Sequence, residues 1–472
     1  MWHGRWRNPT APLILSSFSG RQSIEMNISQ QFLSEIDMVA RRDIPEEVMS
    51  RARRSLLDYL AVTCAGAEFQ KEKMRGYFGF ACPESGQFNA IGLHTKLALK
   101  EAVFLNGLNA HALDFDDGTN SGIIHLGSPI FSLLIPLSQR YLTETDAMLR
   151  AAIIGYEASY TMAVSIQPRH KALGYHATGT CGMLGATLAA AYMLGFTEEE
   201  RFQAFATACV AASGMLKVLD DGSELKPYNV AKTALLSLTS LQLAKSGFKG
   251  HPDPLGGYRG FLKMMSGDEN TKLKHVWLDG TYAIMKSYTK PYASCRYTHP
   301  SVEAAIHLRN QFGIKSDEVE RITIKTYSLA VSGHDHTQIE SIYSAKMSIP
   351  YSTAVALEYG RAGLQEFSAD VCADKRIQEL TGKVAVTADD DLSAIFPEKQ
   401  SAIVEITTHD GSFSERVDFP KGEPENPLSE VEFHERYSSL MAYGNIDQAS
   451  SEEVYVNISQ PNILVSNLIS NL

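Results

Sequence analysis

A cluster of acidic and histidine side chains between residues 111 and 125 has the composition of a proton-transfer site. His111 is followed by three carboxylates, Asp114, Asp116 and Asp117, and His125 comes shortly after them. Close carboxylates raise one another's pKa, so that one can act as an acid beside another that acts as a base. The alternative is a solvated helix end, but negative charge at a helix C-terminus is mildly unfavourable. Asp and His are also metal ligands, although this spacing matches no specific metal-binding loop.

Basic side chains in two further segments have the composition of a carboxylate-binding site. Residues 290–300 (KPYASCRYTHP) combine Lys, Arg, Cys, His and two Tyr directly before an expected helix. An Arg can grip a carboxylate through two parallel hydrogen bonds. Lys226 stands before Pro227 at another expected helix start, where free backbone N–H groups also attract anions. A single lysine before a proline is, however, more often solvated surface.

A histidine and a tyrosine are weaker candidates for acid–base chemistry. His176, within residues 174–180 (GYHATGT), precedes a helix of small residues and can serve as an anion or proton-transfer site or simply cap the helix. Tyr351, within residues 344–351 (SAKMSIPY), can donate a proton or a hydrogen bond to a substrate. Alone, such a tyrosine is more often part of a helix face.

Helices are expected to position these residues over most of the first 270 positions. Asp43 is the expected N-cap of a helix with Pro45 in its first turn, and Thr197 with Glu200 forms a capping-box signal. The Gly- and Ala-rich residues 178–194 would let helices pack closely. The region has no strand-like alternation, which predicts a core of packed α-hairpins. The further helices expected here cover residues 97–113, 128–141, 146–166, 178–194, 197–213 and 227–245.

The sequence pattern changes near residue 275. Residues 321–327 (RITIKTY) alternate with period two, and two expected strands at 402–407 and 413–419 flank an Asp-Gly hairpin signal. Helices are expected at 300–312 and 344–359, between these strands. The prediction is a mainly α protein with a large all-helical domain and a smaller α+β lid domain. The expected segments are a disordered extension at 1–25, the helical domain at 26–272, the α+β domain at 273–425 and a helical segment at 426–472 that packs back on the first domain.

Composition and missing motifs narrow the class of protein. The net charge of -11 argues against nucleic acid or an anionic membrane as partner. The six cysteines are scattered without a C-x-x-C pair, which argues against disulfides, structural zinc and iron–sulfur clusters and favours the cytoplasm. An organelle presequence within residues 1–25 stays open. No apolar run reaches the roughly 18–20 residues of a membrane span, and no nucleotide-binding signature is found, so no nucleotide cofactor is expected.

Five motifs, in order along the chain, resemble the MmgE/PrpD family. They are His111-Ala-Leu-Asp-Phe-Asp-Asp117, Tyr175-His-Ala-Thr-Gly-Thr180, Leu225-Lys-Pro227, residues 290–299 (KPYASCRYTH) and Ala345-Lys-x-Ser-x-Pro-Tyr351. The resemblance implies a helical domain and an α+β lid with the active site between them, usually in a homodimer. It also implies metal-free and cofactor-free chemistry on small polycarboxylates, such as dehydration of 2-methylcitrate, decarboxylation of cis-aconitate or epimerisation of iminodisuccinate.

The predicted function is therefore a cofactor-independent lyase, a dehydratase or decarboxylase of a small di- or tricarboxylate. An epimerase or isomerase, a non-catalytic carboxylate-binding protein and an interaction scaffold are the alternatives. By resemblance, His125 is a general acid or base that Asp114 orients, and Lys226 and Arg296 bind substrate carboxylates. The full set of predicted site residues is Asp114, His125, His176, His299 and Tyr351 for catalysis, and Thr119, Lys226, Lys290, Cys295 and Arg296 for substrate binding.

Overall fold

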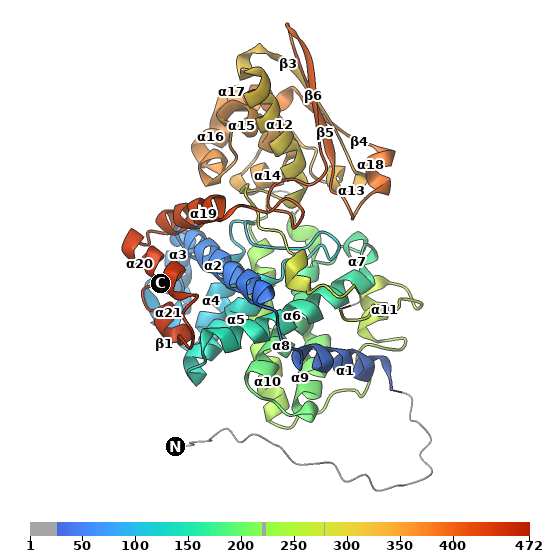
Figure 1. Ribbon diagram of the computed structural model, residues 1–472, viewed down its shortest axis with the longest axis vertical. Helices are drawn as coiled ribbons and strands as arrows, with labels where there is room; N and C mark the ends of the chain where they lie inside the picture. The colour runs from blue at the N-terminus through green and yellow to red at the C-terminus, as the bar shows by residue number, and fades with distance from the viewer. Residues whose placement is uncertain (1–25, 220–222, 278) are drawn as a thin grey trace.

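The computed structural model describes residues 26–219, 223–277 and 279–472, which form a helical body that carries a smaller α+β domain (Figure 1). The predicted extension at residues 1–25 lies outside the described residues. The mainly α architecture with a second α+β part agrees with the fold class that the sequence predicts. Among the described helices, none combines the length and apolarity needed to cross a membrane.

The helical body is built around α8, which packs against α5, α6, α9 and α10. Small residues make this possible: a Cβ atom at Gly185 of α8 would collide with the Gly155 carbonyl and the Ser159 side chain of α6. The Gly- and Ala-rich composition thus serves close helix packing, as the sequence predicts. The helices of the body are α1 (Ile28–Ala40), α2 (Glu46–Phe69), α3 (Lys71–Ala81), α4 (Leu99–Ala110), α5 (Gly127–Tyr141), α6 (Thr145–Ile166), α7 (Arg169–Ala172), α8 (Ala177–Met193), α9 (Glu198–Ala211), α10 (Lys226–Lys245) and α11 (Phe261–Ser266).

Of the two helix-capping predictions for this body, one is confirmed and one is wrong. The capping box at α9 is present, since the Thr197 hydroxyl accepts from the Glu200 N–H at 3.2 Å and the Glu200 carboxylate accepts from the Thr197 N–H. The prediction of Asp43 as a helix cap is wrong, because α2 begins directly after Pro45, whose side chain has no hydrogen-bonding group. Pro45 fixes the entry of the chain through its restricted φ instead.

The prediction of a region without strands is also wrong. Strands β1 (Ser85–Ala90) and β2 (Thr95–Leu97) form an antiparallel hairpin whose turn contains Gly92 at a φ of 73°. Both strands are short and only partly buried, so no apolar alternation marks them in the sequence. Their pairing depends on packing of β1 against α4 and α5, which is a tertiary effect.

A four-stranded mixed sheet forms the α+β domain. Its strands are β3 (Val319–Thr326), β4 (Val384–Ala388), β5 (Ala402–Thr408) and β6 (Gly411–Val417), in the order β4-β3-β5-β6. The β5–β6 hairpin turns at Asp410-Gly411, as predicted. Strand β4, which pairs in parallel with β3, was not predicted; it is an edge strand with mostly exposed side chains. A parallel edge strand takes its register from its neighbour rather than from its own pattern.

Helices cover one face of this sheet and then return the chain to the body. Helix α12 (His299–Phe312) packs on β5 and β6, and α15 (Ile349–Tyr359) packs on α12 and β4. The single helix expected at 344–359 is divided into α14 (Ile342–Met347) and α15, because Ser348 caps α15 and Pro350 lies in its first turn. The smaller helices are α13 (Ser328–Val331), α16 (Ala369–Ala373), α17 (Lys375–Gly382) and α18 (Asp390–Ala394), and the C-terminal ones are α19 (Glu430–Tyr443), α20 (Gln448–Asn457) and α21 (Val465–Leu468). Helix α19 packs on α2 and α21 on α5.

Candidate active site

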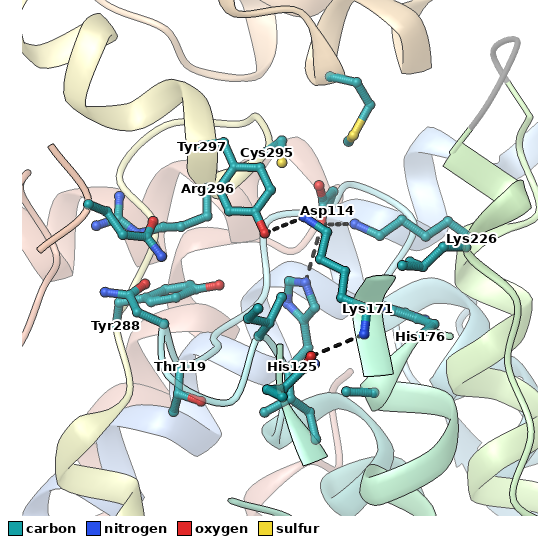
Figure 2. Close-up of a pocket in the computed structure, with 18 of the residues that line it drawn as sticks. Asp114, Thr119, His125, Lys171, His176, Lys226, Tyr288, Cys295, Arg296 and Tyr297 are labelled. Carbon is teal, nitrogen blue, oxygen red and sulfur yellow. Dashed lines mark hydrogen bonds and ion pairs between the residues drawn. The ribbon is translucent and has the colours of Figure 1, made fainter. Parts of the chain in front are cut away.

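A cavity of about 660 Å³ lies where the helical body meets the α+β domain. Its walls come from both parts of the chain, and Figure 2 shows the side chains of the two parts turned toward one another. Eight of the ten predicted site residues line it: Asp114, Thr119, His125, His176, Lys226, Lys290, Cys295 and Arg296. The fold therefore brings together residues that are up to 182 positions apart in the sequence.

Most of the predicted site residues that the helical body contributes to the cavity lie at or near helix termini. The chain leaves α4 at His111, and Asp114 takes a left-handed conformation with a φ of 51°, which Asp tolerates better than most residues. The loop that follows carries Thr119 and His125 and ends where α5 begins. His176 is the N-cap residue of α8, and Lys226 is the first residue of α10.

Asp114 is the acceptor for two buried ammonium groups. The Lys226 Nζ donates to its Oδ1 at 2.6 Å, and the Lys290 Nζ donates to its carbonyl at 2.6 Å and to Oδ1 at 3.2 Å. Burial opposes the charge of this carboxylate, but the two lysines hold its pKa well below the usual range. The same attraction holds the pKa of Lys226 above its usual value against the effect of burial. Asp114 is therefore ionised, and it fixes two cations at the cavity.

His125 presents one ring nitrogen to the cavity with a lone pair. Its Nδ1 donates to the Asp117 carbonyl at 2.8 Å, which places the proton on Nδ1 and leaves Nε2 as the basic atom. Burial lowers the pKa of His125 to about 3, more strongly than Asp116 raises it, so the ring is neutral at neutral pH. The predicted orienting role of Asp114 does not match this geometry, because its Oδ1 lies 3.6 Å from Nε2. The Asp117 carbonyl orients the ring instead.

The other two carboxylates of the motif, Asp116 and Asp117, do not line the cavity but bind neighbouring groups of the helical body. Asp116 accepts from His111 Nδ1 at 2.9 Å and from the Ser128 hydroxyl at 2.6 Å, and histidine contacts lower its pKa despite burial. Asp117 accepts from the Tyr156 hydroxyl at 2.6 Å and from the N–H that opens α5 at 2.9 Å. Burial raises the pKa of Asp117 to about 6. Asp117 thereby ties the loop between α4 and α5 to α5 and α6.

Two further basic side chains, Lys171 and Arg296, line the cavity. Burial lowers the pKa of Lys171 to about 8, and its Nζ lies 2.5 Å from the Tyr297 hydroxyl, close to the Lys226 ammonium group (Figure 2). Arg296 is buried, forms an ion pair with Glu423, and has its guanidinium carbon 5.0 Å from the centre of the Tyr288 ring. The Nε and Nη1 atoms of this guanidinium have no partner among the described residues and can each donate to a carboxylate.

Polar atoms without partners surround the same cavity. Within the part of the chain that the structure describes, the buried atoms Asp114 Oδ2, Thr119 Oγ1, His176 Nδ1 and Arg296 Nε and Nη1 have no hydrogen-bond partner. Buried polar groups in proteins are nearly always paired, and exceptions call for a functional explanation. Burial also holds the pKa of His176 well below its usual value, so this ring is neutral. The concentration of these atoms around one cavity indicates a polar ligand.

The acidic motif also contains the donor set of a candidate cation site. One donor atom each from His111, Asp114, Asp116 and His125 lies within 4.8 Å of the others. However, the Asp114 oxygen already accepts from two ammonium groups, and Asp116 accepts from His111. Lysine side chains thus supply the positive charge that a metal would bring, and metal-free chemistry remains the prediction.

Two predicted catalytic residues do not line the cavity. The Tyr351 hydroxyl donates to the Glu366 carbonyl at 2.8 Å inside the α+β domain, and the His299 Nε2 lies 3.2 Å from the Ser294 carbonyl. In the motif that contains Tyr351, Met347 is the residue that lines the cavity. The Lys346 Nζ next to it donates to the Leu113 carbonyl at 2.7 Å, and burial lowers the pKa of Lys346 to about 7. Tyr351 is buried and its ring packs against Phe367, a direction that the motif alone does not give.

Sequence reasoning missed several residues of the cavity wall. They are Lys171, Tyr288, Tyr297, His334 and Gln400, which come from four separate segments. Tyr297 lies inside the predicted carboxylate-binding segment 290–300, but the sequence assigned no role to it. Lys171 and His334 stand in ordinary polar sequence, and only the fold brings them to the cavity.

Comparison with known proteins finds family matches in both parts of the chain. Residues 30–274 match the MmgE/PrpD N-terminal domain and residues 292–459 match the MmgE/PrpD C-terminal domain. A cis-aconitate decarboxylase of Aspergillus terreus is 25% identical over 452 residues, which cover 89% of this chain and 91% of the relative. The cis-aconitate decarboxylase of Mus musculus is 23% identical, covering 87% of this chain and 86% of that protein.

A third relative matches over a shorter region. The 2-methylcitrate dehydratase of Escherichia coli is 24% identical over 253 residues, about half of each chain. The two domain matches together cover most of the sequence, in the order that the motifs predict. The chain belongs to the MmgE/PrpD family.

Proposed function

We propose that this protein is a lyase that moves a proton at a carbon next to a carboxylate of a small di- or tricarboxylate. The observation that carries the proposal is the cavity itself, in which Lys171, Lys226 and Arg296 surround a neutral His125. Cations bind the substrate carboxylates, and a neutral imidazole beside them transfers the proton. The chemistry requires no metal or organic cofactor in this proposal.

Three basic residues would each bind the substrate carboxylates in a different way. Lys226 is held by Asp114 at the centre of the cavity, where a carboxylate would meet an ammonium group that is already fixed. Arg296 keeps two buried guanidinium nitrogens unpaired within the described residues. Lys171 adds a third cation beside the Tyr297 hydroxyl. Fixed charges in a site shielded from water stabilise developing negative charge without reorganisation.

Decarboxylation is the first reaction to test. The relatives that match this chain over nearly its full length are named cis-aconitate decarboxylases. In such a reaction one carboxylate leaves as carbon dioxide, the double bond shifts, and a proton is added to carbon. The negative charge of a bound tricarboxylate would oppose the lowering of the His125 pKa, which would let His125 donate as well as accept.

Dehydration is the second candidate, and the tautomer of His125 favours it. Because Nδ1 carries the proton, the free Nε2 lone pair can remove a proton next to a carboxylate while a hydroxyl group leaves. The 2-methylcitrate dehydratase of Escherichia coli is a relative over about half of this chain. The two reactions share the cavity and differ in the direction of proton transfer.

Proton NMR in D2O with 2-methylcitrate, citrate, cis-aconitate and iminodisuccinate distinguishes these reactions. Loss of carbon dioxide with deuterium incorporated at carbon establishes decarboxylation, and loss of water establishes dehydration. Exchange of a carbon-bound proton with inversion would replace both by the epimerase alternative. If His125→Asn turned over the same substrate at the wild-type rate, the role proposed for this histidine would be wrong.

We also propose a homodimer in the cytoplasm. The six cysteines are all free in the structure, which suits a reducing compartment. Light scattering after size exclusion tests the dimer: a mass near 104 kDa, twice that of the 51.9 kDa chain, is expected, and a mass of one chain would contradict it.

A further inference from the structure

A cysteine and a histidine that the proposed mechanism leaves unused meet at the cavity. Cys295 and His334 both line it, and His334 is the side chain that acts most strongly on the Cys295 thiol. The two residues come from separate segments of the α+β domain, one before α12 and one after α13. Figure 2 shows Cys295 on the far side of the Asp114 carboxylate from His125. The cavity thus has a thiol on one side and an imidazole on the other.

Local contacts orient the imidazole of His334 toward the thiol. Its Nδ1 donates to the Ser332 carbonyl at 2.8 Å, so Nε2 is the nitrogen that remains for Cys295. The ring is also held edge-on against Tyr297, with ring centres 5.1 Å apart and planes at 85°. The backbone N–H of Cys295 donates to the Lys346 carbonyl at 2.9 Å, which fixes the other partner. Both members of the pair are therefore preorganised.

The charges around Cys295 favour a thiol that ionises near neutral pH. Burial opposes the thiolate, but His334 and, more weakly, Lys226 outweigh it and lower the pKa of Cys295 to about 7, although Asp114 acts against them. Burial alone raises the pKa of Cys64 and Cys181 to about 12. The other groups that interact electrostatically with Cys295 are Lys171, Tyr288, Tyr297 and Tyr327.

We propose that Cys295 and His334 form a second proton-transfer pair, with Cys295 as the catalytic acid that gives its proton to the substrate and His334 as its positioning residue. This inference rests on the lyase activity proposed above. It assigns Cys295 a role in chemistry, beyond the substrate binding that the family resemblance implies. It also gives the cavity two acid–base groups on opposite sides of the bound carboxylates.

The decarboxylation step balances with this assignment. The Cys295 proton goes to the alkene carbon, the electron pair of the breaking C–CO₂ bond forms the new double bond, and carbon dioxide leaves. A tricarboxylate trianion and a neutral thiol thus give a dicarboxylate dianion, a thiolate and carbon dioxide. A proton from water, passed through His334, then restores the thiol. In a dehydration the same proton would go to the leaving hydroxyl group while His125 removes the proton from carbon.

Alkylation of the intact protein tests the pair without an activity assay. Iodoacetate carries a carboxylate that Lys171 and Lys226 would hold near Cys295, whereas iodoacetamide does not. We expect Cys295 to favour iodoacetate over iodoacetamide about tenfold more than the exposed Cys82 does at pH 7, as measured by peptide mass spectrometry. His334→Asn should move the midpoint of Cys295 alkylation from near pH 7 to higher pH. Equal preference at both cysteines, or an unmoved midpoint, would overturn the proposal.

Kinetics then separate this pair from the proposed function. Cys295→Ser should lower kcat about 100-fold or more, change substrate affinity less than threefold, and lose the kcat pH dependence near 7. Cys372→Ser, in the same domain but outside the cavity lining, is the matched control. An active wild type with an equally active Cys295→Ser enzyme would refute only the pair. An inactive wild type would refute the lyase proposal, and the alkylation result alone would then decide whether the pair exists.

Discussion

Replacing Lys226 by Met tests both the stability and the chemistry of the site. The Lys226 Nζ lies 2.6 Å from the Asp114 Oδ1, and the two side chains are only 12% and 7% exposed. Removing one partner of a buried ion pair costs about 3–5 kcal/mol, because the other charge stays buried. Here Lys290 lies 3.2 Å from the same oxygen and compensates in part. We therefore expect the free energy of unfolding of Lys226→Met to fall by about 1–3 kcal/mol.

The effect on catalysis should be separable from this loss of stability. A hydrogen bond from a charged group contributes about 1.5–3 kcal/mol, which corresponds to a loss of about 10- to 150-fold in kcat/KM. The measurements are urea denaturation and initial rates on the substrate that the NMR screen identifies. Lys245→Met is the matched control, since Lys245 ends the same helix and binds the Glu200 carboxylate on the surface.

A double variant decides between a structural and a substrate-binding role. In Lys226→Met with Asp114→Asn, both charges of the pair are gone but the buried Lys290 loses its carboxylate partner, so the free energy of unfolding should not recover, and kcat/KM should stay low. Three results would refute the reasoning: kcat/KM within twofold of wild type in Lys226→Met, an equal loss in Lys245→Met, or recovery of kcat/KM in the double variant.

Four further outcomes follow from the same structure. His125→Asn should lower kcat about 10²- to 10⁴-fold at unchanged melting temperature, and a loss below threefold would exclude it as the proton-transfer group. Tyr156→Phe leaves the buried Asp117 with one fewer donor and should cost about 1–3 kcal/mol in urea denaturation, whereas Tyr160→Phe on the same helix should cost less than about 0.5 kcal/mol. Burial lowers the pKa of His170 to about 4, so below pH 6.5 only the unfolded chain binds this proton. The free energy of unfolding should then fall as the pH drops from about 6.5 to 4, by up to about 1.4 kcal/mol per pH unit, and His170→Gln should flatten that slope. Dialysis against EDTA should leave activity within twofold, and a loss that a divalent ion restores would contradict the metal-free mechanism.

The sequence by itself determined the helical body, the strands that carry strong alternation and the family. Period-two alternation at β3 and the Asp-Gly turn between β5 and β6 are local signals, as is the capping box at α9. Six of the eight predicted site residues that line the cavity lie within the motifs that resemble the family. These features are readable because each depends on residues that are close together in the chain.

Weak or exposed elements could not be read in the same way. Strands β1, β2 and β4 are short and only partly buried, so their pairing partners, and not their own residues, decide that they form. The two parts of the segment from 342 to 359 look like one helix until Ser348 and Pro350 are seen to start a new one. Local propensity is a weak guide where tertiary contacts dominate.

Only the tertiary structure decided what each site residue does. Asp114 was predicted to orient His125, yet it binds two lysines, and the Asp117 carbonyl sets the tautomer of His125 instead. Lys171 and His334, from unremarkable segments, join the cavity because the α+β domain lies over the end of the helical body (Figure 1). Residue types set which chemistry is available, whereas hydrogen-bond partners and burial set protonation, and these depend on contacts between segments that are far apart in the chain.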